Sequence, residues 1–198
     1  MNPNVSIEKI TLINFRNHQN TNISDLRPFI VLTGENGSGK TNLLEAISLF
    51  APGRGLKNAQ FKEIPFLESG IRCFEIKLEI RYDTGSIILH RHFSEDNKRK
   101  NFITLDEEKI NNSELLNYLN ILWVTPIMEK IMLQSNSEKR SFFDRLTFNV
   151  NNNHLKNLSK LQKLLRERLT LLKKVNYEYE WMSILENKIA EISFVIIN

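Results

Sequence analysis

The stretch Gly34-Glu35-Asn36-Gly37-Ser38-Gly39-Lys40-Thr41 fits the phosphate-binding pattern G-x-x-x-x-G-K-[ST] at every constrained position. Its glycines let the backbone curl, so that successive N–H groups point into one concavity that suits phosphate oxygens. In this pattern the lysine reaches the β- and γ-phosphates, and the hydroxyl that follows it ligates Mg²⁺. The stretch therefore predicts a nucleoside triphosphate site in which Thr41 is the metal ligand.

The sequence on either side of this loop supports a strand–loop–helix unit. Residues 29–33 are a continuous apolar run of strand length, which predicts a parallel strand buried on both faces. Residues 41–50 carry apolar side chains at helical spacing and are followed by Pro52-Gly53, so a helix is expected directly after the loop. Phosphate would then lie at a helix N-terminus, where the free N–H groups and the dipole favour negative charge. An ordinary glycine-rich turn is the alternative.

Composition places the chain among globular proteins. It has 198 residues, of which 41% are hydrophobic and 25% charged, enough for one domain or one and a half. No segment has the length of a membrane-spanning helix and the N-terminus does not resemble a signal peptide, so a cytoplasmic protein is expected. The single cysteine, Cys73, cannot form an internal disulfide and is predicted to lie in the core.

Positive charge is concentrated in one part of the chain. The formal net charge is only +4, but residues 139–174 hold ten Lys or Arg against two acidic residues, a local balance of +8. A basic tract of this kind suits a polyanion such as DNA, although a solvated helix face has the same composition.

Residues 5–33 and 73–105 have the pattern of strands, and residues 51–72 that of a connecting or functional loop. Ile10, Leu12 and Phe15 indicate a first strand, and residues 20–23 a short second one. From residue 73 the apolar residues alternate, turn at Asp83-Thr84-Gly85 and return, which predicts an antiparallel β annex.

Two polar segments of this region could carry chemistry. Asp106-Glu107 follows a short apolar run and imitates the strand that supplies a metal-binding Asp and a catalytic Glu in many ATPases. Hairpin-like residues follow it and it lies within the antiparallel region, so we favour a structural role for the pair and leave the catalytic residues unassigned. The three cations Lys98, Arg99 and Lys100 are expected at a solvent-facing hairpin tip, with DNA contact as the second interpretation.

The last third of the chain is predicted to be helical. A strand is expected at residues 121–124. After it, a leucine stripe at spacings of three and four predicts the packing seam of a helix that pairs with a second helix from about residue 178. The stripe consists of Leu158, Leu161, Leu165, Leu169 and Leu172. The basic residues of this arm are the first candidates for DNA contact: Lys156, Lys160, Lys163, Arg166 and Arg168. We expect two domains, residues 1–150 and residues 151–198.

In this arrangement the sequence resembles the RecF family of bacterial DNA replication and recombination-repair ATPases, which is related to the structural-maintenance-of-chromosomes and Rad50 proteins. The resemblance runs over essentially the whole chain. The segments that carry it are residues 12–17, Gly34 through Ala46, Pro52-Gly53-Arg54-Gly55, Trp123-Val124-Thr125-Pro126 and Lys139 through Leu146.

The resemblance implies a fold class and a function. The fold would be α/β, a P-loop NTPase lobe of the ABC-ATPase type with an antiparallel β annex and a helical arm. The implied function is ATP-dependent binding of single-stranded or gapped DNA in replication and recombinational repair, with SOS induction and recombinase loading. ATP and Mg²⁺ are the implied cofactors, RecR and RecO the implied partners, and an ATP-dependent homodimer is expected. Arg16 and Lys57 are then expected at the nucleotide.

The sequence departs from the family pattern at three points. Lys57 stands where relatives carry an arginine that approaches the phosphates, which keeps the charge but loses the bidentate geometry. Ile127 stands where the family has an acidic or amide side chain. The L-S-x-G-type signature and the acidic strand of the family's second half are not found, and Leu158-Ser159-Lys160 lacks the glycine. The sequence therefore suggests only the first half of the ATPase head.

Two other classes remain open. A small-molecule kinase or GTPase could contain the same loop, but no N-K-x-D guanine motif is found and the antiparallel annex suits neither. A non-catalytic nucleotide-binding remnant is the other alternative, because no general base can be assigned.

Overall fold

The computed structural model describes residues 5–66, 68, 70–95, 101–148, 150–173 and 179–197. Contacts group the chain into two units, residues 1–123 and 124–198. The predicted domains, residues 1–150 and 151–198, stay a prediction. Lys98, Arg99 and Lys100 lie outside the described residues, as does the side chain of Ile127.

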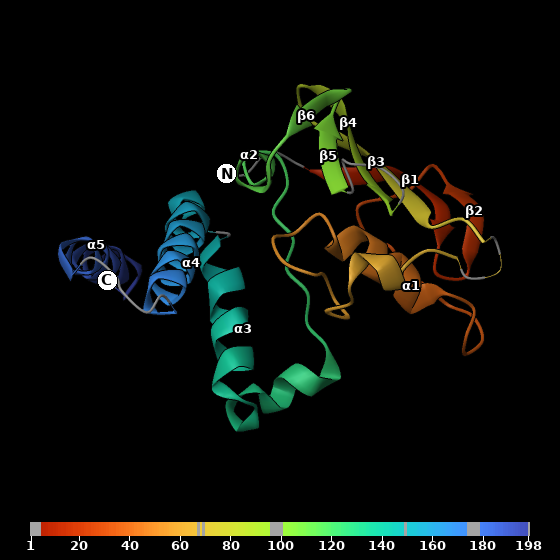
Figure 1. Ribbon diagram of the computed structural model, residues 1–198. Coiled ribbons are helices and arrows are strands. Elements are labelled where there is room, and N and C mark those ends of the chain that lie inside the picture. The colour runs from red at the N-terminus through yellow and green to blue at the C-terminus, as the bar shows by residue number, and fades with distance from the viewer. Residues whose placement is uncertain are drawn as a thin grey trace. The chain divides into compact units, whose positions relative to one another are not determined.

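The first unit is built on a six-stranded antiparallel sheet with the strand order β2-β1-β3-β4-β5-β6 (Figure 1). The strands are β1 (Ser6–Phe15), β2 (His18–Ile23), β3 (Cys73–Tyr82), β4 (Gly85–Ser94), β5 (Asn101–Leu105) and β6 (Glu108–Ile110). β1, β2 and the β3–β4 hairpin confirm the alternation read from the sequence, including the turn at residues 83 and 84.

Helix α1 (Lys40–Ser48) packs on one face of this sheet (Figure 1). Alternate residues of each strand point toward the face of the sheet that α1 covers, because successive side chains of a strand point to opposite faces. The core formed between them includes Ile10, Leu12, Phe15, Phe74, Ile76, Leu78, Ile80 and Leu89 from the strands and Leu43 and Ala46 from α1. The short helices η1 (Phe61–Glu63) and α2 (Asn112–Leu115) also belong to this unit, and Phe61 and Leu115 pack on the same core.

The prediction of a buried parallel strand at residues 29–33 is wrong for this structure. The segment is irregular, and Phe29 and Val31 are 95% and 84% exposed, while Leu32 packs against the core. A strand buried on both faces needs neighbouring strands, and none of the six described strands pairs with this segment.

Two smaller predictions also fail. Residues 121–124 form no strand, and Val124 is 79% exposed although Ile121 packs against the core. Cys73 is half-buried at the start of β3 and is not part of the buried core. Both failures arise because an apolar residue type does not by itself specify a packing partner.

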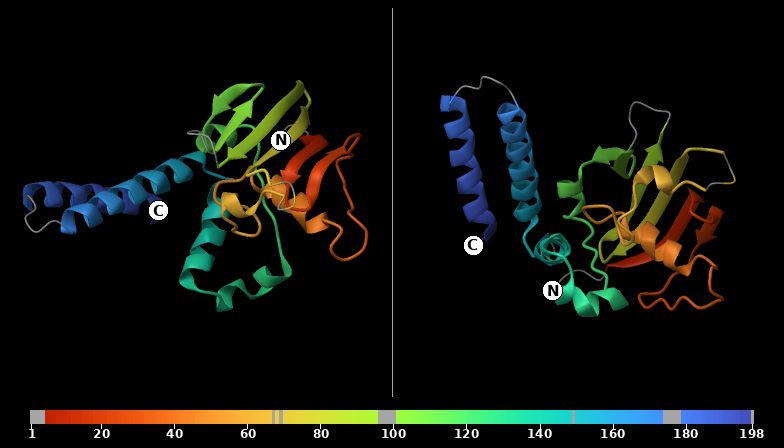
Figure 2. Two further views of the ribbon diagram at one scale, coloured as in Figure 1. Left: turned by 45° about the vertical axis from the view of Figure 1, so that its right-hand side comes forward. Right: turned by 60° about the horizontal axis from the view of Figure 1, so that its bottom comes forward.

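The second unit contains η3 (Pro126–Leu133), α3 (Asn136–Phe148), α4 (Asn152–Leu172) and α5 (Tyr179–Ile197). Helices α4 and α5 run side by side as the predicted antiparallel pair (Figure 2). None of the described helices combines the length and the apolar character needed to span a bilayer.

The predicted leucine seam of α4 is only partly correct. Leu158 and Leu161 are buried as expected, but the seam continues through Leu164, which packs with Leu161 against α5. The other three predicted members are exposed to between 43% and 53%, namely Leu165, Leu169 and Leu172. Spacings of both three and four fit a helical stripe, so the sequence could not select between Leu164 and Leu165.

Candidate nucleotide-binding site

The phosphate-binding loop leads directly into α1, as the sequence predicted. Gly34, Gly37 and Gly39 adopt φ values of 144°, 87° and 96°, which L-residues rarely tolerate. Gly39 is the N-cap residue of α1, and the helix begins at Lys40. The free N–H groups of the first helical turn therefore face the loop, as an anion site requires.

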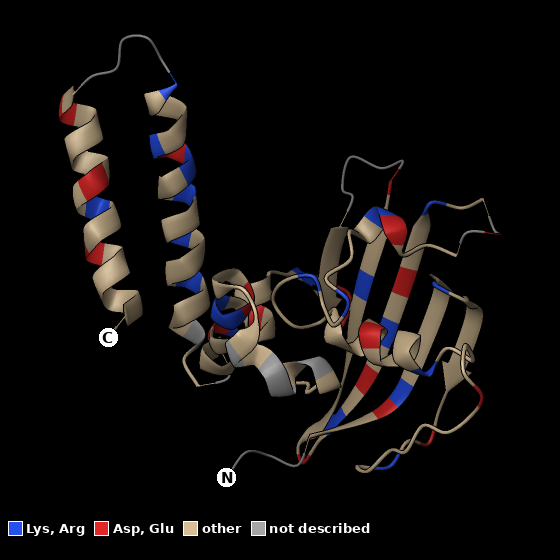
Figure 3. Cartoon of the chain, turned by 90° about the horizontal axis from the view of Figure 1, so that it is seen from below, with Lys and Arg blue, Asp and Glu red and all other residues tan. Residues whose placement is uncertain are grey.

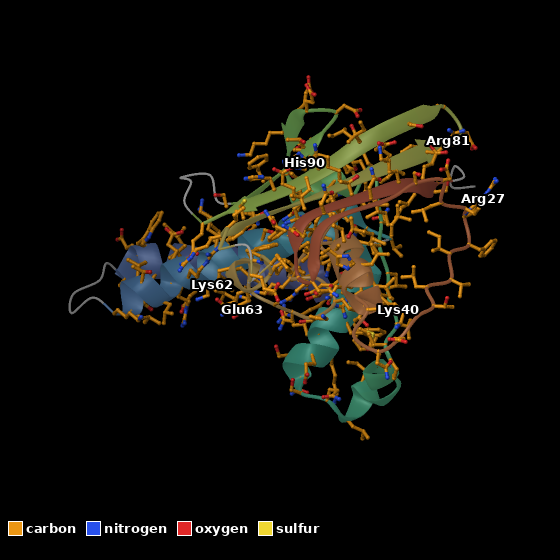
Figure 4. The ribbon with its side chains drawn as sticks, turned by 90° about the vertical axis from the view of Figure 1, so that its right-hand side faces the viewer. Arg27, Lys40, Lys62, Glu63, Arg81 and His90 are labelled. Atoms are coloured by element: carbon orange, nitrogen blue, oxygen red, sulfur yellow. The ribbon has the colours of Figure 1, made fainter. Side chains whose placement is uncertain are left out.

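Lys40 is the central cation of the loop. Its Nζ donates hydrogen bonds to the carbonyl oxygens of Gly34 at 2.8 Å and Glu35 at 2.6 Å, and it lies 3.4 Å from Ser38 Oγ. The loop therefore encircles the ammonium group. A hollow of about 180 Å³ opens beside it, and its lining residues are Asn36, Gly37, Gly39, Lys40, Thr41 and Asn42. Figure 4 shows Lys40 on the side of the sheet that carries α1.

The turn between β1 and β2 supports the loop from outside. The Asn17 amide donates to the carbonyl of Gly37 at 3.3 Å, and His18 Nε2 lies 3.3 Å from the carbonyl oxygen of Gly39. A Cβ added at Gly39 would come within 2.7 Å of His18 Nε2, so this glycine is required by a close approach. Sequence reasoning missed Asn17 and His18, whose proximity depends on the hairpin and not on any local motif.

A second line of contacts connects this turn to the residues after α1. Asn42 donates to Asn17 Oδ1 at 2.8 Å and accepts from Lys57 Nζ at 2.6 Å. Lys57 Nζ also lies 3.3 Å from Glu45 Oε2. Lys57 is therefore beside the first turns of α1, where it contacts Asn42 and Glu45.

Arg16 occupies the buried end of the same network. Its Nε and Nη2 donate to the two carboxylate oxygens of Glu45 at 2.9 Å and 2.5 Å, and its Nη1 donates to the carbonyl of Glu63 at 2.8 Å. Glu45 is fully buried, and Arg16 is 20% exposed. The described contacts of Arg16 thus position α1, and its predicted nucleotide contact stays a prediction.

Asp106 and Glu107 lie in the turn between β5 and β6. Both have positive φ, 46° and 74°, as expected for a tight hairpin. The Asp106 carboxylate accepts a hydrogen bond from the N–H of Ile88 at 2.8 Å, and the Asp106 N–H donates to the Ile88 carbonyl. The pair therefore forms a structural turn, which supports the interpretation that it has no catalytic role.

The basic residues of α4 divide into two groups. The side chains of four of them are exposed, namely Lys156, Lys160, Lys163 and Arg166. Figure 3 shows the blue of Lys and Arg at intervals along this helix. Arg168 instead donates through Nε and Nη2 to Glu186 Oε1 of α5, at 2.9 Å and 2.8 Å. Arg168 is therefore occupied in holding the helix pair together and is the weakest of the candidates for DNA contact.

Comparison with known proteins agrees with this architecture. The AAA domain family model matches residues 9–193. The chain is 36% identical over 195 residues to the DNA replication and repair proteins RecF of Rickettsia prowazekii (strain Madrid E) and Rickettsia felis (strain ATCC VR-1525 / URRWXCal2). In both cases the match covers 98% of this chain and 53% of the relative.

A solved structure of the recombination mediator protein RecF with ATP, from the RecFOR pathway, superimposes on 98% of this chain with a TM-score of 0.86 and 24% identity. A second one, of RecF with ATPrS, gives a TM-score of 0.84. At this identity the likeness concerns the fold, and it confirms the predicted α/β class with its antiparallel annex.

The chain therefore belongs to the AAA domain family. Its homologues are RecF proteins, which confirms the family resemblance found in the sequence, and it spans about half the length of the curated relatives that it matches.

Proposed function

We propose that this chain is an ATP-binding part of a RecF-type DNA replication and repair protein. The observation that carries the proposal is the loop around Lys40, which has three glycines at positive φ and holds the ammonium group of Lys40 at the N-terminus of α1. The chain's RecF homologues and the RecF–ATP structure support the choice of nucleotide.

The residues present fit ATP with Mg²⁺. The carbonyls of Gly34 and Glu35 hold the ammonium group of Lys40 at the loop, so this charge is placed to balance that of the phosphates. Residues 34–41 would bind the phosphates, and Thr41 would supply the hydroxyl for Mg²⁺. Lys57 is a further cation near the loop, because it donates to Asn42, whose amide donates to Asn17, and Asn17 in turn donates to the Gly37 carbonyl of the loop. When bound, the metal ion would neutralise charge on the phosphate oxygens.

The remaining functional expectations are extensions of this proposal. DNA, single-stranded or gapped, would contact the exposed basic residues of α4 through its phosphates, without sequence preference. An ATP-dependent homodimer, binding of RecR and RecO, roles in SOS induction and recombinase loading, and a cytoplasmic location follow from the RecF family. Each of these rests on the homology.

A second candidate is nucleotide binding without efficient turnover. Glu45 is bound by Arg16 and Lys57, and Asp106 is bound to the backbone of β4, so neither carboxylate is available to position a water. Since the chain covers about half of its relatives, the catalytic carboxylate is expected to come from outside it. This alternative predicts binding with negligible hydrolysis.

The test is ATP binding and hydrolysis by the purified 198-residue chain, with and without single-stranded and gapped DNA. Lys40→Ala should abolish binding, while Lys62→Ala, on the short helix η1, serves as the control for loss of a lysine. Binding that depends on Lys40 supports the proposal, and negligible turnover then favours the second candidate. Equal binding by wild type and Lys40→Ala would overturn both, and a preference for GTP would point to another NTPase class.

A further inference from the structure

A group of three potential metal ligands lies on the outer face of the sheet. His90 and His92 are two residues apart on β4, so both side chains point to the same face. Glu75 on the neighbouring strand β3 stands directly opposite His92 in the strand register. Figure 4 shows His90 on the side of the sheet away from α1 and Lys40, so this group is separate from the nucleotide-binding loop.

The carboxylate of Glu75 brings the two imidazoles together. Its Oε2 lies 3.1 Å from His90 Nε2, and its Oε1 lies 3.5 Å from His92 Nδ1. One ligand atom from each of the three residues can be chosen so that all lie within 4.8 Å of one another. Ligand atoms around a tetrahedral zinc ion are about 3.3 Å apart, as follows from metal–ligand distances of about 2.0–2.1 Å. A small movement of the three side chains toward one another would bring their ligand atoms to the spacing that a tetrahedral zinc ion needs.

The surroundings hold these side chains in place. The three are 20–30% exposed, and the His92 ring is stacked on Phe102 of β5 with centroids 5.0 Å apart. Burial lowers the pKa of His90, with a further lowering by Lys77 and His92 that opposes the effect of Glu75. Neutral imidazole is the form that binds a metal ion.

We propose that Glu75, His90 and His92 form a binding site for a divalent transition-metal ion of the zinc class. Two imidazole nitrogens and one carboxylate oxygen are a donor set that suits zinc. Three protein ligands leave one position of a tetrahedral ion for water or for a side chain of a partner. A metal here would link β3 to β4 across the outer face of the sheet.

The first experiment is a calorimetric titration of the 198-residue chain, free of any histidine tag, with Zn²⁺. One site per chain is expected. Even loss of a group that supports a ligand lowers metal affinity about 10- to 100-fold, so Glu75→Gln and His90→Gln should each weaken binding at least about tenfold. Glu79→Gln is the matched control, because Glu79 lies on the same strand and face but is paired with Lys9. Cys73→Ser controls for the nearby thiol and should leave the affinity unchanged.

A second measurement identifies the ligands independently of affinity. The chain has four histidines, and their ring nitrogens can be followed by long-range ¹H–¹⁵N correlation spectra. Zn²⁺ should shift His90 and His92 at one equivalent and leave His18 and His154 unchanged. The proposal is overturned if Zn²⁺ shifts the four histidines alike, if binding is lost in Cys73→Ser, or if Glu75→Gln binds as tightly as Glu79→Gln. Circular dichroism of each variant establishes that the fold is retained.

Discussion

The guanidinium of Arg16 forms a two-point hydrogen bond with the carboxylate of Glu45, at 2.9 Å and 2.5 Å. This pair joins the turn after β1 to the middle of α1, so the helix that follows the phosphate-binding loop is fixed to the sheet. Glu45 is fully buried, and its remaining charged contact is Lys57 at 3.3 Å. The position of the loop thus depends on an ion pair outside the loop motif.

Arg16→Ala should destabilise the fold strongly. Removing one partner of a buried ion pair leaves an uncompensated charge, which typically costs about 3–5 kcal/mol, and Lys57 would keep the loss near the lower value. The measurement is chemical denaturation without nucleotide. Lys9→Ala is the matched control, because its pair with Glu79 is 34% and 40% exposed and should contribute at most about 1 kcal/mol. Similar losses in the two variants would contradict the buried role of the Arg16–Glu45 pair.

Gly39→Ala should impair the nucleotide site more than its backbone strain alone explains. Both Gly39 (φ 96°) and Gly53 (φ 106°) would strain a side chain, at a cost of about 1–3 kcal/mol. At Gly39 the added methyl would also displace Asn17 and His18, whereas nothing lies within 4 Å at Gly53. We expect Gly39→Ala to lower ATP affinity at least about tenfold, as measured by calorimetry, because it removes the two contacts that support the loop. An affinity as high as that of Gly53→Ala would show that these contacts are dispensable.

The exposed lysines of α4 should determine the salt dependence of DNA binding. If Lys156, Lys160 and Lys163 contact phosphates, replacing all three with Ala should reduce the slope of log K against log salt by about 2–3 units. Fluorescence anisotropy with a labelled single strand at several salt concentrations measures this slope. Arg168→Ala is the comparison, since its pairing with Glu186 predicts a smaller change in slope than Arg166→Ala. An unchanged slope in the triple variant would show that these three lysines of α4 do not contact DNA phosphates.

The stability of the chain should fall as the pH drops below about 6.5, in part because of His90. Burial lowers the pKa of His90 in the folded state, so the unfolded state takes up the proton first and is favoured as the pH falls. Lys77 and His92 act in the same direction, and Glu75 opposes them. Melting temperatures with a chelator present, measured from about pH 7.5 to 5.0, should depend less on pH in His90→Gln than in wild type. If the melting temperatures of the two proteins fell equally with pH, His90 would not be a source of the pH dependence.

Local pattern was sufficient to predict much of the fold. Alternation identified β1, β3 and β4, and the phosphate-binding motif located the start of α1 within a residue. These features depend on neighbours in sequence. The strands expected at residues 29–33 and 121–124 depended on neighbours in space, and no described strand provides them.

The candidate site was predicted unevenly for the same reason. The loop motif specified Lys40, but the contacts of Asn17 with Gly37 and of Asn42 with Lys57 join segments far apart in the chain. Glu75, His90 and His92 likewise meet through the β3–β4 register. A single sequence records residue types at each position and carries no direct measure of these distances.

The order of the strands has a consequence for how the chain folds. β3, β4, β5 and β6 are consecutive hairpins, so they can form from contacts that are short in sequence. β1, by contrast, pairs with β3 across the whole segment that contains the phosphate-binding loop and α1, and closing such a loop is slower. Competence to bind nucleotide should therefore appear late during refolding, after most of the sheet has formed.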